Sequence, residues 1–288
     1  MNIDLHCHTN LSDGTLTPDQ LLDLAVERDI KMLSITDHDT LDAYSGITSF
    51  PQSIEIITGI EFSSQWEKLG VHVVGLNLNL SSSDLNDAVL MQSKIRSNRA
   101  QKIAEQLSKL GFKGTLAGAK GLASNQIGRP HFAQYLVEMG AVRDSKEAFR
   151  KYLGAGKPGD IKEDWPDIGE VIDWIRASGG VAVLAHPKKY KMTRTKLVSL
   201  ISDFCAAGGE GIEVVSGQQT PQETRELAKL ANQFGLMASC GSDFHTPDNK
   251  WASLGRISNL PDICLSLIHI SEPTRLRRIS YAVVCLKK

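Results

Sequence analysis

NIDLHCHTNLSDGT, residues 2–15, contains a short apolar strand that ends in His6-Cys7-His8 and is followed by Asp13. Side chains two residues apart on a strand point to the same side, so His6 and His8 form a ready chelating pair. Cys7 points the other way, and we expect it to pack in the wall behind the two imidazoles. A strand end of this kind needs partners from elsewhere in the chain.

Strand-like apolar runs alternate with helical patterns through most of the chain. The segment TPDQLLDLAVERDI predicts a helix start, with Thr17 as N-cap, Pro18 in the first helical position and Gln20 completing a capping box. Predicted strands cover residues 31–39, 53–64 and 71–78, and the last two are joined by a short polar turn. The alternation resumes after residue 165. This order predicts an α/β fold with parallel strands, arranged as a barrel or an open sheet.

Residues 84–156 differ in character from the parts on either side. Apolar side chains recur at helical spacing up to Gly111, and two shorter helices are expected to begin at Pro130 and at Asp144. The segment carries twelve basic against six acidic side chains. A basic cap above a metal-demanding centre suits a polyanionic substrate, whereas the alternative is an ordinary solvated helix surface. For three cations on the long helix, Arg96, Lys102 and Lys109, we expect a position on such a solvated surface.

Composition excludes several classes of protein. With 288 residues and 41% hydrophobic side chains, the chain can bury one large core, or one core and a smaller inserted unit. No apolar run approaches the roughly 20 residues of a membrane span, and residues 1–15 lack signal-peptide features, so we expect a cytoplasmic protein without membrane contact. The five cysteines are scattered and form no CxxC pair, which indicates neither a disulfide framework nor a thiolate zinc site.

The last stretch of the chain, LSLIHISEPTRLRRISYAVVCLKK (265–288), continues no periodicity of the preceding residues and is abruptly basic. It resembles a translated sequencing adaptor followed by its flanking primer. We therefore expect a non-native tail in which His269 and Cys285 have no evolved role. A native C-terminal strand is the alternative.

Ligand-type side chains gather at or near the ends of the predicted strands. Nine precede the basic tail: His6, His8, Asp13, His38, Glu61, His72, His186, Asp243 and His245. Imidazole and carboxylate without thiolate select zinc, manganese or iron (Zn²⁺, Mn²⁺ or Fe²⁺), and nine groups exceed the four or so ligands of one ion. Two or three divalent metal ions are therefore predicted, with Glu61 as a carboxylate that bridges them. Such a cluster suits hydrolysis of a phosphate ester by a metal-activated hydroxide.

Taken in order, these motifs resemble the polymerase and histidinol phosphatase (PHP) superfamily of metal-dependent phosphoesterases. The resemblance runs through residues 2–264 and rests on DLHCHTNLSDG, ITDHDT, GIEFS, VHVVGL, LAHP and GSDFH. It implies an irregular (β/α)7-type barrel made by residues 1–83 and 157–264, with residues 84–156 as a helical cap. It also implies three ions: one held by His6, His8, Glu61 and Asp243, one by Glu61, His72 and His186, and one by Asp13, His38 and His245. Catalytic roles fall on Asp13, Glu61 and His245.

Within that superfamily the chain is similar to the nucleotide 3′,5′-bisphosphate phosphatases that also act as 5′→3′ exoribonucleases on short RNA. The matching segments are WEKLGVHVVGLN, RSNRAQKIAEQL, GRPHFAQYLVEMG and KYLGAGKPG. The resemblance implies a nucleotide or short RNA substrate, and we assign its phosphate to Arg129 and His131 at a helix start, with a structural role as the alternative for His131. Further candidates for the same role are Ser12, Arg99 and Lys188.

Other readings stay open. Asp37 and Asp39 are expected to orient ligating histidines, although Asp39 would serve equally well as a cap for the next segment. Histidinol-phosphate phosphatase shares the ligand scheme, and the GRPHFA segment argues against it. A third possibility is a non-catalytic, metal-bound module that binds RNA or a protein. No stable protein partner is implied by the sequence.

Overall fold

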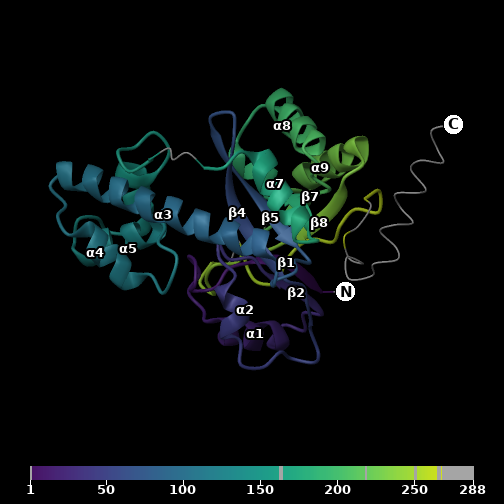
Figure 1. Cartoon of the computed structure of the whole chain (residues 1–288), viewed down its shortest axis with the longest axis horizontal. Coiled ribbons are helices and arrows are strands. Elements are labelled where there is room, and N and C mark those ends of the chain that lie inside the picture. Colours follow the sequence, from purple (N-terminus) through teal and green to yellow (C-terminus); the bar gives the residue numbers. More distant parts are fainter. Residues whose placement is uncertain (1, 162–164, 218, 250–251, 265–266, 268–288) are drawn as a thin grey trace.

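The computed structural model describes residues 2–161, 165–217, 219–249, 252–264 and 267. These residues form two neighbouring β-sheets with helices around them (Figure 1). The smaller sheet contains, in spatial order, β1 (Ile3–Cys7), β2 (Met32–Ile35) and β3 (Glu55–Ile56). The larger sheet contains, in spatial order, β4 (Gly59–Trp66), β5 (Leu69–Leu76), β6 (Val181–Leu184), β7 (Gly211–Ser216) and β8 (Met237–Gly241). The predicted α/β class is confirmed.

The expectation of uniformly parallel strands is wrong for β5. β5 runs antiparallel to both β4 and β6, whereas all other pairs within the two sheets are parallel. The cause is the short turn between β4 and β5, in which Glu67 has a φ of 54°. A connection of this length permits only an antiparallel hairpin, since a parallel pair needs a long crossover.

The two sheets meet at two seams, one between β1 and the loop after β8 and one between the loop after β2 and β4. The Asp243 N–H donates to the His6 carbonyl at 2.8 Å, and the Asp39 N–H donates to the Glu61 carbonyl at 3.0 Å. Isolated parallel bridges join Cys7 to Phe244 and His38 to Glu61. The ladders of the described residues therefore form two sheets with bridged seams, and they do not amount to one closed barrel.

Helices cover the outer faces of the sheets. They are α1 (Pro18–Glu27), α2 (Asp42–Gly46), α7 (Ile168–Ala177), η2, a 3₁₀ turn (Pro187–Tyr190), α8 (Arg194–Ala206) and α9 (Pro221–Phe234). Thr17 caps α1 with the predicted reciprocal bonds to Gln20, so this helix start is confirmed. The apolar faces of α7 and α9 pack on the larger sheet and build its main hydrophobic core. Cys7 is fully buried in a second cluster under the smaller sheet, as expected.

The segment between β5 and β6 extends to one side of the strands (Figure 1). It contains α3 (Ser83–Lys109), α4 (Thr115–Leu122), α5 (Arg129–Glu138), α6 (Ser145–Ala148) and η1, a π-helical turn (Phe149–Leu153). The predicted starts at Pro130 and Asp144 are confirmed, whereas α4 was not predicted. These helices share a hydrophobic cluster of their own, which includes Leu107, Phe132 and Leu153.

Almost all of the predicted non-native tail, residues 265–288, lies outside the described residues. The exception is Leu267, which is buried in the main core against Gly211. Among the described residues, no helix has the length and apolar character needed to cross a membrane.

Candidate metal centre

The nine ligand-type residues identified in the sequence lie together at one edge of the sheets. They come from strand ends and the loops beyond them: His6, His8 and Asp13 from β1 and its loop, His38 after β2, Glu61 on β4, His72 on β5, His186 after β6, and Asp243 and His245 after β8. Among the described residues, they form overlapping groups whose ligand atoms lie within 4.8 Å of one another. Most of the convergence follows from parallel strands, because their carboxyl ends meet at the same edge.

His72 reaches this edge from the opposite chain direction. It lies near the start of β5, where its carbonyl accepts the N–H of Ala185 at 3.1 Å. Ala185 is followed by His186, and the two imidazoles come within 3.3 Å of each other, from His72 Nδ1 to His186 Nε2. β5 thus supplies His72 from its first half, while the adjacent antiparallel strand β6 is followed by the ligand His186.

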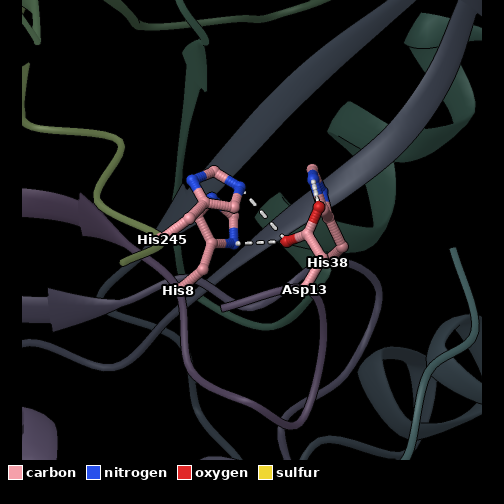
Figure 2. A group of neighbouring side chains, drawn as sticks. All are labelled: His8, Asp13, His38 and His245. Atoms are coloured by element: carbon pink, nitrogen blue, oxygen red, sulfur yellow. Dashed lines mark ion pairs between the residues drawn. The ribbon is translucent and has the colours of Figure 1, made fainter. Parts of the chain in front are cut away.

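The carboxylate of Asp13 lies between three imidazoles. Figure 2 shows it with His8 and His245 on one side and His38 on the other. Asp13 Oδ1 is 3.2 Å from His245 Nε2 and 3.9 Å from His8 Nδ1, and Oδ2 is 3.7 Å from His38 Nε2. Burial would raise the pKa of Asp13, but the charges of His245 and His38 hold it well below its usual value. Asp13 is therefore present as an anion that faces a ring of nitrogen ligands.

Glu61 occupies the centre of the cluster and is fully buried. Its Oε1 lies 2.8 Å from both His72 Nδ1 and His186 Nε2. Its Oε2 lies 3.0 Å from His38 Nδ1 and 3.2 Å from His6 Nε2. Because each oxygen faces a different set of imidazoles, the carboxylate has the placement of a bridging ligand.

His6 and His8 point the same way, as the strand period requires. Their Nε2 atoms are 3.1 Å apart, and Asp243 Oδ1 lies 3.6 Å from the first and 3.2 Å from the second. The second oxygen of Asp243 contacts the Nζ of Lys189. Two imidazoles and a carboxylate therefore converge on one point from β1 and from the loop after β8.

Several of these atoms are buried without a hydrogen-bond partner, which tests whether the site fits a metal. They include His8 Nδ1, Asp13 Oδ1, His38 Nδ1 and Glu61 Oε2. Buried polar atoms are normally paired, so such a concentration in one place requires an explanation. Divalent cations that take nitrogen and oxygen ligands would satisfy these atoms, and the donor set suits manganese, zinc or iron.

Comparison with known proteins agrees with this geometry. Residues 4–156, more than half of the chain, match the family model of the PHP domain. The chain belongs to the PHP domain family. Its residues His6 to Glu61 and its cap segment both fall within the matched span of the PHP domain.

Curated relatives align along nearly the whole chain. A 3′,5′-nucleoside bisphosphate phosphatase of Chromobacterium violaceum is 40% identical, covering 96% of this chain and 98% of the relative. A 5′-3′ exoribonuclease Rnm of Escherichia coli is 42% identical, covering 90% of this chain and 89% of the relative. A solved structure of an amidohydrolase from C. violaceum, with bound sulfate and no metal, has a TM-score of 0.88 at 38% identity and covers 94% of this chain and 96% of its own.

Two buried carboxylates that support the PHP site were missed in the sequence analysis. Glu213 on β7 accepts a hydrogen bond from His6 Nδ1 at 2.5 Å and another from the His186 N–H at 2.6 Å. Asp4 on β1 accepts from the backbone N–H groups of Ser242 and Gly255 at 2.8 and 2.7 Å. The signal for both was a single carboxylate inside an apolar strand, where a charge is retained only when it is paired.

A pocket of about 590 Å³ adjoins the PHP site, and basic residues of the cap are among those that line it. Arg99 and Arg129 both line it, together with Asp13, His38 and His72. Arg129 Nη1 donates to the Leu153 carbonyl at 3.2 Å, and burial lowers the pKa of its guanidinium. Both arginines thus lie where a substrate above the metal ligands would be contacted.

Two other candidate substrate residues are occupied by internal hydrogen bonds. His131 is buried, and its Nδ1 accepts the Gly128 N–H at 3.0 Å, which satisfies a donor at the start of α5. This bond supports the structural alternative for His131. Ser12 is also buried, and its hydroxyl donates to Asp37 Oδ1 at 2.6 Å. This hydroxyl already has its acceptor within the protein, and a role of Ser12 in binding the substrate phosphate stays a prediction.

Lys188, the remaining candidate for the substrate phosphate, lies in a pocket other than that of the PHP site. Its Nζ pairs with Glu226 at 2.7 Å and lines a separate pocket together with Arg194 and Leu197. The neighbouring Lys189 lines the PHP pocket instead and contacts Asp243. Adjacent side chains on a 3₁₀ turn point roughly 120° apart, so only one of the two lysines can face the site.

The aspartates beside His38 stabilise the loops and make no hydrogen bond to an imidazole. Asp37 accepts from the Thr9 N–H at 2.7 Å and from the hydroxyls of Thr9 and Ser12. Asp39 is paired with Arg96, which is buried rather than on the solvated face of the long helix. The prediction for Arg96 was therefore wrong, because a helical pattern alone does not reveal a buried anion opposite the helix.

Proposed function

We propose that this PHP protein is a metal-dependent phosphoesterase that removes the terminal phosphate of nucleoside 3′,5′-bisphosphates and cleaves at the 5′ end of short RNA. The single observation that carries the proposal is the cluster of nine ligand-type residues, three of which line a pocket together with basic residues of the cap. The names of the relatives at about 40% identity support the substrate class. A cytoplasmic location belongs to the same proposal and is tested by cell fractionation.

The ligand sets of the proposal are those that the family resemblance implies, and their members lie within the overlapping groups of donor atoms. One ion would be held by His6, His8, Glu61 and Asp243, a second by Glu61, His72 and His186, and a third by Asp13, His38 and His245. His8 Nδ1 also faces Asp13, so it is available to the third set. When bound, divalent ions at this place would polarise the phosphoryl oxygens and lower the pKa of water. Manganese, zinc and iron all fit these donors.

The chain's own residues bind and orient the substrate and hold the ligands in place. Arg129 and Arg99, which line the pocket, would bind a phosphate above the cluster, and Lys189 would neutralise charge next to Asp243. Glu213 holds the proton of His6 on Nδ1, which leaves Nε2 for a ligand bond. Asp13, Glu61 and His245 are the proposed catalytic residues, since they face the pocket or the centre of the cluster.

The domain arrangement is part of the proposal. Residues 1–83 and 157–264 would form one catalytic unit of the irregular (β/α)7 type, and residues 84–156 would form a cap. Support comes from the bridged seams between the two sheets and from the separate hydrophobic cluster of the helical segment. The basic side chains of that segment that line the pocket fit a substrate with more than one phosphate.

The test is release of inorganic phosphate from adenosine 3′,5′-bisphosphate by metal-free protein to which Mn²⁺ is added. A 5′-phosphorylated short RNA and histidinol phosphate serve as parallel substrates. We expect turnover of the bisphosphate and the RNA, loss of turnover in His8→Ala, and a raised KM in Arg129→Ala. Turnover of histidinol phosphate alone would overturn the substrate assignment. Metal-dependent RNA binding without turnover would indicate a binding module instead.

A further inference from the structure

Arg96 is a buried arginine in the middle of α3, with 8% of its surface exposed. Its Nε donates to Asp39 Oδ2 at 2.5 Å, and its Nη2 donates to the Ser63 hydroxyl at 3.0 Å. Asp39 has no exposed surface. Removing a charged pair from water is costly and requires close geometry with further hydrogen bonds, and this pair has both.

Asp39 fixes the strand and the loop that carry two of the central ligands. Its Oδ1 accepts the Ser63 N–H at 2.7 Å, and its own N–H donates to the Glu61 carbonyl at 3.0 Å. On the other side of His38, the Glu61 N–H donates to the Asp37 carbonyl at 3.2 Å. Backbone hydrogen bonds of the residues on both sides of His38 therefore hold it beside Glu61.

Asp39 also has a strained backbone, with a φ of 55°. A residue other than glycine adopts this left-handed conformation at a cost, and it is maintained only when the surroundings determine it. The contacts of Asp39 with Ser63 and Arg96 hold its backbone in this conformation. They are made by a strand of the sheet on one side and a helix of the cap segment on the other.

The guanidinium of Arg96 also contacts an aromatic side chain from the segment that follows the cap. It lies over the ring of Trp165, 5.6 Å from the ring centroid. Gln92, one turn earlier on α3, is also buried and donates to the Ser63 carbonyl at 2.7 Å. Two consecutive turns of α3 are thus fastened to the segment that follows Glu61.

We infer that Arg96 is a positioning residue, which acts through Asp39 to hold His38 and Glu61 together and so couples the cap segment to the metal centre. The inference rests on the proposed metal centre and adds a residue outside the ligand set. It assigns Arg96 a role in metal affinity rather than in direct binding of substrate. Arg96 lines the pocket beside Arg99 and Arg129, but its guanidinium is already engaged by Asp39, Ser63 and Trp165, which supports this role.

The test is titration of metal-free protein with MnCl₂ by calorimetry, which requires no turnover. We compare the wild type with Asp39→Asn, Arg96→Met and the double variant, with Lys109→Met as control on the exposed end of the same helix. The double variant leaves no unpaired buried charge, so it keeps the test decisive where Arg96→Met alone unfolds. Circular dichroism checks folding.

We expect each single variant to weaken Mn²⁺ binding about tenfold and the double variant to weaken it by a similar factor, since the two residues act as one unit. At saturating Mn²⁺ the KM of the folded variants stays within about twofold of the wild type. A double variant that binds Mn²⁺ as tightly as the wild type would overturn the inference, and so would a raised KM with unchanged Mn²⁺ affinity. A wild type that binds Mn²⁺ but releases no phosphate would contradict the proposed function and leave the inference standing.

Discussion

His6 Nδ1 lies 2.5 Å from Glu213 Oε1, and both side chains are buried at the base of the metal centre. The carboxylate accepts the Nδ1 proton and thereby turns Nε2 towards Glu61 and Asp243. The other oxygen of Glu213 accepts the N–H of His186 at 2.6 Å. One carboxylate outside the ligand set thus orients two residues within it.

Replacing Glu213 by glutamine is expected to weaken metal binding by about tenfold or more. Glutamine keeps the size and one acceptor, but it removes the charge that increases the basicity of His6. Calorimetric titration of metal-free protein with Mn²⁺ measures the effect. Glu210→Gln, an exposed change at the preceding turn, is the matched control. An unchanged Mn²⁺ affinity in Glu213→Gln would show that the contact does not support the site.

Metal binding should release a proton at neutral pH. Burial by itself lowers the pKa of His6, but the carboxylates of Glu213 and Glu61 outweigh it and raise the pKa to about 10. A ring protonated below pH 10 must lose a proton before Nε2 can bind a metal, so affinity rises with pH by up to about tenfold per unit. His186 has a pKa lowered by burial to about 4, so it is neutral throughout the range tested.

The measurement is Mn²⁺ affinity between about pH 6.5 and pH 8.5, together with proton uptake or release in two buffers of different ionisation enthalpy. Glu213→Gln removes one of the charges that raise the pKa of His6, so its pH dependence should be shallower. A wild-type affinity that is flat over this range would contradict the assignment of His6 as a protonated ligand in the metal-free protein.

Asp4 should be important for stability even without metal. Its carboxylate accepts the backbone N–H groups of His6, Ser242 and Gly255, and it is fully buried. Asp4→Ala leaves these donors unpaired, and we expect a loss of about 3 kcal/mol in the free energy of unfolding. Urea unfolding of metal-free protein measures it, with the exposed Asp173→Ala on α7 as control. A loss below about 1 kcal/mol would mean that the donors find other partners.

Gly241 marks the close approach of β8 to β1. A Cβ added at this position would lie 2.8 Å from the backbone nitrogen of His6, so the strand that carries His6 would have to move. Gly241→Ala should therefore lower the free energy of unfolding by about 1–3 kcal/mol and weaken Mn²⁺ binding as well. Gly121→Ala in α4, where a Cβ meets nothing within 4 Å, is the control and should be slightly stabilising. Wild-type stability in Gly241→Ala would contradict the packing described.

Much of the fold and the cluster was predictable because its signals are local. Helix starts such as Thr17 and Asp144 follow from capping chemistry, and His6 and His8 follow from the strand period. The residues whose roles were not predicted correctly are those whose position depends on tertiary contacts. Arg96 has the pattern of a surface cation until Asp39 is seen opposite it, and the choice between Lys188 and Lys189 depends on how a short 3₁₀ turn is oriented.

The central claim is that the nine-residue cluster makes this chain a metal-dependent phosphoesterase. The most direct test adds Mn²⁺ to metal-free wild type and to Glu61→Gln and follows phosphate release from adenosine 3′,5′-bisphosphate. We predict Mn²⁺-dependent release by the wild type and near-complete loss in Glu61→Gln, since the bridging carboxylate contacts imidazoles through both of its oxygens. Equal release by the two proteins, or release by the wild type without any metal, would contradict the claim.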